Sequence, residues 1–63
     1  MKVYTLIRDF LGADEDMEEY YLEQIIPAKD QLDIEEILCI LEEEHATRLQ
    51  IEMLEEALGL SLS

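Results

Sequence analysis

Glu42 and His45 have a spacing typical of metal ligands in helical bundles. Di-iron carboxylate bundles use a glutamate and a histidine three residues apart, which project from the same side of a helix. A two-fold dimer would supply the second copy that such a site needs. Glutamate-rich helices often contain this spacing by chance, however, and a histidine near a helix end commonly has a structural role. We therefore expect no metal ion at this pair.

Asp14, Asp16 and Glu18 alternate along the chain as the first ligands of a calcium-binding loop do. The sixth residue of such a loop is a glycine, and the twelfth is a glutamate that binds the ion through both oxygens. Here these positions hold Glu19 and Ile25. The stretch is instead typical of the acidic first turn of a helix, so we expect no calcium site.

Cys39 is the only cysteine and His45 the only histidine, which leaves one combination for nucleophilic catalysis. On a helix these residues would lie about 9 Å apart along the axis and out of register around it, so the thiol and the imidazole would not meet. The sequence has no glycine-rich phosphate-binding loop. A chain of 63 residues is also too short to enclose a substrate pocket of roughly several hundred Å³. We expect a protein that is not an enzyme and that holds no cofactor.

The strongest feature of the composition is its negative charge. The chain contains 17 Asp and Glu residues against 4 Lys and Arg residues, a formal net charge of −13. Such a charge repels nucleic acid and anionic lipid head groups. We therefore expect no direct binding to nucleic acid or membranes, and we expect a protein partner with a basic surface.

Composition also limits the fold and the compartment. At 63 residues the chain has room for one small core, so residues 1–63 form a single acidic helical domain. Hydrophobic residues make up 49% of the chain, which argues against disorder, and 2 glycines and 1 proline are too few for several β-hairpins. A single cysteine and the lack of a long apolar run predict a soluble protein of the cytoplasm.

Apolar residues at three- and four-residue intervals predict a helix over 2–11, with Gly12 as its left-handed C-terminal cap. A second helix is expected over 15–25, because residues 13–16 supply an N-cap oxygen and negative charge for its first turn. Pro27 should end this helix, followed by a turn over 27–29.

A third helix is predicted to begin after Asp30 or Asp33, because each lies three residues ahead of another acidic residue, which is the capping spacing. Its expected apolar face is Ile34, Ile37, Leu38, Leu41 and His45, widened by Cys39 and Ile40. Thr47 can cap a fourth helix, with Gly59 just past its end. The third and fourth helices could instead fuse through His45 and Ala46, because neither residue breaks a helix.

The predicted fold is all-α, a small three- or four-helix bundle. A homodimer is an open alternative, because some apolar residues are not obviously covered in a monomer this small. These residues are Tyr20, Cys39, Leu60 and Leu62.

Part of the chain resembles acyl carrier proteins. Residues 30–37 read D-Q-L-D-I-E-E-I and residues 41–45 read L-E-E-E-H, which is similar to that family's second helix, D-S-L-D-x-x-E-L followed by L-E-E-E-F. The helix that ends at Leu11-Gly12 also resembles the family's first helix, so the resemblance covers residues 3–45. Gln31 stands where the family carries the serine that accepts the phosphopantetheine arm, and the region after His45 is too short for the last two helices. The resemblance implies a carrier-like binding module without the prosthetic group.

Two functions are consistent with these features. The first is an inhibitor or regulator that presents carboxylates to a basic, nucleic-acid-binding surface of a partner protein, as phage-encoded DNA mimics do. The second is a structural or adaptor protein that uses an apolar helix face, or a homodimer, while the acidic residues keep it soluble. The first function predicts two partner-binding acidic patches, formed by Asp14, Glu15, Asp16, Glu18 and Glu19 and by Glu42, Glu43 and Glu44.

Overall fold

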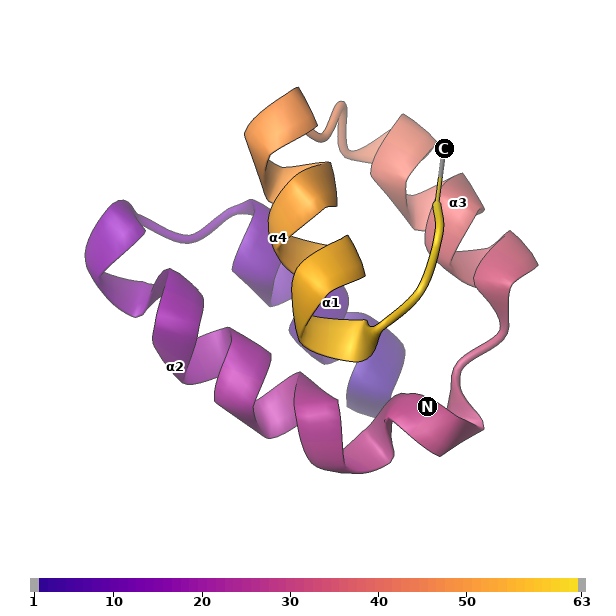
Figure 1. Ribbon diagram of the computed structural model, residues 1–63. Helices are drawn as coiled ribbons and strands as arrows, with labels where there is room; N and C mark the ends of the chain where they lie inside the picture. The colour runs from indigo at the N-terminus through magenta and orange to yellow at the C-terminus, as the bar shows by residue number, and fades with distance from the viewer. Residues whose placement is uncertain (1, 63) are drawn as a thin grey trace.

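The computed structural model describes residues 2–62, and within this range the chain is all-α, without a β-strand. Four α-helices and one 3-10 helix follow one another along the chain (Figure 1). Their bounds are α1 Lys2–Leu11, α2 Glu15–Ile25, η1 Ile26–Gln31, α3 Ile34–Glu43 and α4 Arg48–Leu58. The predicted bounds of the first two helices, 2–11 and 15–25, are confirmed.

All four α-helices contribute to one core. α1 packs against α2 and α3, and α4 lies in front of α1, with α2 on one side and α3 on the other (Figure 1). The molecule measures 26 × 23 × 20 Å. The buried apolar side chains are Val3, Ile7, Phe10, Leu22, Ile25, Ile37, Ile40, Leu41, Leu54, Leu58 and Leu62.

The link between α1 and α2 differs from the prediction in its details. Gly12 does not adopt the left-handed conformation, because the only described residues with positive φ are His45 and Gly59. The amide of Gly12 instead donates to the carbonyl of Arg8 at 3.1 Å, which continues the helical pattern. Asp14 is the N-cap of α2, but its side chain makes no capping hydrogen bond.

Pro27 changes the type of helix where we expected a turn. α2 ends at Ile25 and the chain continues as the 3-10 helix η1, with Pro27 in its first turn. A proline fits there because its missing N–H is not needed in the first turn of a helix.

α3 begins as predicted, but the predicted apolar face is partly wrong. Asp33 caps the helix by accepting a 3.0 Å hydrogen bond from the amide of Glu35, and its own amide donates to the Tyr4 hydroxyl at 3.0 Å. The buried residues are Ile37, Ile40 and Leu41. Ile34 and Leu38 keep 42% and 41% of their surface exposed, and Cys39 is exposed. The helical period was right, but the buried face is centred further round the helix, where α1 packs.

α3 and α4 are separate helices, so the fused alternative is wrong. His45 adopts φ 54°, and the amide of Ala46 donates to the carbonyl of Leu41 at 2.9 Å. This six-residue hydrogen bond is the Schellman ending of a helix. The predicted caps of α4 are confirmed, since Thr47 forms a capping box and Gly59 has φ 66°.

The C-terminal tail after α4 folds back onto the molecule, on the α3 side of α4 (Figure 1). Leu62 is buried, and its amide donates a 2.8 Å hydrogen bond to Oε2 of Glu55. Leu60 is half-buried. Of the four apolar residues expected to lack cover, Leu60 and Leu62 are therefore packed within one chain, whereas Tyr20 and Cys39 are exposed.

Candidate functional site

The two predicted acidic patches lie apart. The five acidic residues at 14, 15, 16, 18 and 19 surround the start of α2, and the three at 42–44 lie at the end of α3. Figure 1 shows these helix ends on opposite sides of α4. All eight side chains are exposed except that of Glu18, which is half-buried.

One arginine partly neutralises the patch at the end of α3. Arg8 of α1 contacts Oε1 of Glu43 at 3.1 Å, with 49% and 61% of the two side chains exposed. Exposed pairs of this kind contribute about 0–1 kcal/mol. Arg8 also lines an open hollow of about 380 Å³ together with Asp9 and Asp14. Arg8 therefore pairs with one member of the α3 patch and borders a hollow that Asp14 of the other patch also lines.

The body of α2 is uniformly negative. It contains five acidic residues among its 11 residues and no lysine or arginine. Glu15, Glu19 and Glu23 recur every four residues, so they form a stripe along one side of the helix, with steps of about 6 Å. Like charges at this spacing destabilise a helix by about 0.2–0.5 kcal/mol per pair. The helix dipole favours Glu15 in the first turn, so the stability of α2 does not account for Glu19 and Glu23.

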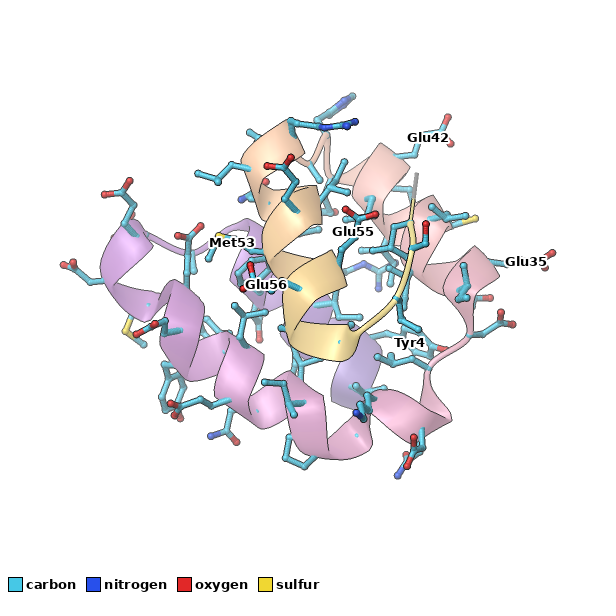
Figure 2. All side chains as sticks on the ribbon, viewed as in Figure 1. Tyr4, Glu35, Glu42, Met53, Glu55 and Glu56 are labelled. Carbon is cyan, nitrogen blue, oxygen red and sulfur yellow. The ribbon has the colours of Figure 1, made fainter. Side chains whose placement is uncertain are left out.

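This side of α2 borders a groove shared with α4. Five residues line the groove, which has a volume of about 300 Å³: Glu19, Leu22, Met53, Glu56 and Ala57. In Figure 2, Met53 and Glu56 lie on the side of α4 that faces α2. Leu22, Met53 and Ala57 are its apolar lining, which we call the floor, and we call the α2 side with Glu19 and the α4 side with Glu56 its two walls. We refer to these five residues as the acidic groove.

Sequence reasoning identified only Glu19 among the residues of the acidic groove. Leu22, Met53, Glu56 and Ala57 were not among the predicted site residues. Glu52 and Glu56 are four residues apart on α4, a second acidic stripe that the sequence does show. That the two stripes flank one groove follows only from the packing of α4 beside α2.

The candidate metal and catalytic residues do not converge. Among residues 2–62, no three His, Cys, Asp or Glu side chains are placed to hold one metal ion. Glu42 lies in the last turn of α3 and His45 beyond its end, so the two do not share one side of a helix. Cys39 lies exposed on α3, and Gln31 is the exposed last residue of η1.

No family model, curated protein or solved structure matches this chain. None of the helices within residues 2–62 has the length and apolar character needed to cross a membrane. The chemistry of the candidate site is therefore that of its own side chains, which are carboxylates around a small apolar floor.

Proposed function

We propose that this chain is a non-enzymatic binding module that inhibits or regulates a cytoplasmic partner protein by covering a basic, nucleic-acid-binding surface. The observation that carries the proposal is the charge of α2, which contains five acidic residues and no lysine or arginine. Four of the five side chains are exposed and Glu18 is half-buried. The lysine and arginine side chains of a partner can therefore contact these carboxylates without competing with a basic residue of α2 itself.

The size of the molecule suits this role. Its longest dimension is 26 Å, a length over which duplex DNA carries roughly 15 phosphates. The chain carries 17 carboxylates, although they are spread over several faces. A field of this sign attracts basic surfaces over long range and raises the association rate at low salt.

Solubility alone does not require so much charge. A small domain is kept soluble by a net charge of about 2–8 in magnitude, and this chain has −13. The additional acidic residues include Glu19 and Glu23 of the α2 stripe, which repel each other one helical turn apart. A binding role accounts for acidic residues in positions that are unfavourable for the isolated chain.

Affinity purification tests the proposal. The tagged chain is incubated with lysate of its own cells and washed in parallel at about 50 and about 500 mM salt, because salt screens exposed charges. We expect a basic, nucleic-acid-binding protein that is retained only at low salt, and we expect added DNA to compete with the chain for this partner. A partner that is retained at high salt and is indifferent to DNA would contradict the proposal.

Two triple variants with equal net charge sharpen the test. Replacing Glu15, Glu19 and Glu23 with glutamine should release the partner. Replacing Asp30 with asparagine and Glu35 and Glu36 with glutamine removes the same charge outside both predicted patches and should have a smaller effect. Equal retention of the partner by the α2 variant and the unmodified chain would contradict the role given to α2.

An adaptor role is the second candidate, and the exposed residues of α3 favour it. Ile34 and Leu38 are one helical turn apart, each about two-fifths exposed, and could pack against a partner helix or a second copy. Binding through them would resist salt and would be lost in Ile34→Ser and Leu38→Ser variants. The salt-resistant fraction of the same purification therefore distinguishes the two functions.

A further inference from the structure

The floor of the acidic groove is apolar and adaptable. Leu22 is nearly fully buried and belongs to the core, whereas Met53 and Ala57 are half-buried and border the groove. Methionine is flexible and polarisable, which suits a surface that must fit side chains of another protein. The side chain of Ala57 is only a methyl group, so it leaves space in the groove for a side chain of a partner.

The walls of the groove are acidic on both sides. Glu19 lies in the α2 wall and Glu56 in the α4 wall. Each has acidic neighbours one helical turn away on its own helix, Glu15 and Glu23 on α2 and Glu52 on α4. Of these neighbours, Glu52 forms an ion pair with Arg48 at 3.9 Å, and both side chains are more than half exposed.

We propose that the acidic groove receives an amphipathic helix of the partner protein, with apolar side chains on the floor and lysine or arginine side chains against both walls. This inference rests on the proposed function and specifies the face and the partner segment involved. Charge complementarity selects the occupant, because both walls are anionic and the floor is apolar. A second copy of this chain, at −13, would bring like charge to the same walls.

The dimensions favour a helix over a small molecule. A volume of about 300 Å³ that opens to solvent is at the lower limit of ligand pockets, and it can take only a few side chains. Both walls are helices of 11 residues, about 16 Å long. A docked helix anchors through apolar residues at i, i+3, i+4 and i+7. Its lysine and arginine stems lie on apolar surface while their charged ends reach carboxylates.

The test uses a designed peptide as the probe. It is an amidated helix of leucine and lysine, about 14 residues long, with leucines at i, i+3, i+4 and i+7. A scrambled peptide of the same composition, without an apolar face, is the peptide control. Fluorescence anisotropy at about 50 mM salt compares both peptides on the unmodified chain. We expect the amphipathic peptide to bind at least about tenfold more tightly than the scrambled one.

Two double variants of equal net charge locate the binding face. Glu19→Gln with Glu56→Gln removes one carboxylate from each wall, and Glu35→Gln with Glu36→Gln removes two exposed carboxylates of α3 that lie outside both predicted patches. We expect at least about tenfold weaker peptide binding for the groove variant and less than about threefold for the α3 variant. Circular dichroism establishes that both variants keep their helices.

The binding face can also be mapped on the unmodified chain, without relying on the folding of a variant. Titration of the isotope-labelled chain with the amphipathic peptide should shift the backbone amide signals of Leu22, Met53 and Ala57 more than those of Ile34 and Leu38. Larger shifts along α3 would overturn the groove as the docking face.

The remaining outcomes separate this inference from the proposed function. Equal weakening by the two double variants, or equal binding of the scrambled peptide, would overturn helix docking while an acidic surface that binds basic partners still stands. Failure of the unmodified chain to bind either peptide at low salt would overturn both.

Discussion

The side-chain amide of Gln50 connects the end of α1 to the start of α4. Its Nε2 donates a 2.9 Å hydrogen bond to the carbonyl of Leu11, while its Oε1 accepts one of 2.9 Å from the amide of Thr47. The Leu11 carbonyl is among the last four of α1, which have no intrahelical donor. One side chain therefore satisfies unpaired backbone groups of two helices, although Gln50 and Leu11 are 39 residues apart in sequence.

Gln50→Glu should lower the free energy of unfolding by about 1–2 kcal/mol. The variant keeps an oxygen that can complete the capping box, but it loses the N–H donor and places a charge near the Leu11 carbonyl. Urea denaturation followed by circular dichroism measures the change. Gln24→Glu on the exposed side of α2 adds the same charge and is the control. Equal stability of these two variants would contradict the role of Gln50.

His45→Gly should stabilise the protein by up to about 1 kcal/mol, because glycine adopts the left-handed conformation without strain. Gly59→Ala is the matched variant, which should change the stability in the opposite direction. Gly59 has φ 66° and its added Cβ would meet no atom within 4 Å, so backbone strain alone should cost about 1 kcal/mol. Thermal melts measure both, at about 4–8 °C per kcal/mol. A lower melting temperature for His45→Gly would show that its imidazole contributes more than its strain costs.

Raising the salt concentration from about 50 to about 500 mM should raise the free energy of unfolding. Salt screens the repulsion among the carboxylates of a chain that carries −13. Replacing both Glu19 and Glu23 with glutamine relieves repulsion along α2 and should reduce this salt effect. Urea denaturation at the two salt concentrations gives the comparison. A stability that falls with salt would indicate that ion pairs outweigh repulsion.

Leu62→Ala should lower the free energy of unfolding by about 2 kcal/mol, at the low end for a buried leucine. This side chain belongs to the C-terminal tail and packs into the core, and only 8% of the residue is exposed. Leu49→Ala, at a leucine that is 62% exposed, should change stability by less than about 0.5 kcal/mol. Urea denaturation of the two variants decides this. Similar losses at both positions would contradict the packing of the tail.

Local signals were sufficient to predict the helices and several of their caps. The four-residue period around Val3 and Ile7, the threonine at 47 and the glycine at 59 each report on neighbours within one or two turns. The break at His45 had only a weak signal in the sequence, because histidine is enriched among non-glycine residues with positive φ but few histidines adopt that conformation.

Long-range features could not be predicted from the same signals. Periodicity identifies an apolar face but not which part of it a neighbouring helix covers, so Ile34 and Leu38 were wrongly expected in the core. The acidic groove joins Glu19 to Glu56, which are 37 residues apart. Their proximity depends on how α2 and α4 pack, and a charge count carries no information about that.

The folded-back tail determines from which direction the molecule can be attached to something else. The tail carries Leu62, whose amide donates a hydrogen bond to Glu55, and Figure 1 shows this tail on the α3 side of α4, away from α2. The acidic groove opens on the other side of α4. A linker, a dye or a fused domain joined after the tail would therefore project away from the groove, and a chain anchored to a sensor surface by this end would present the groove to the solution.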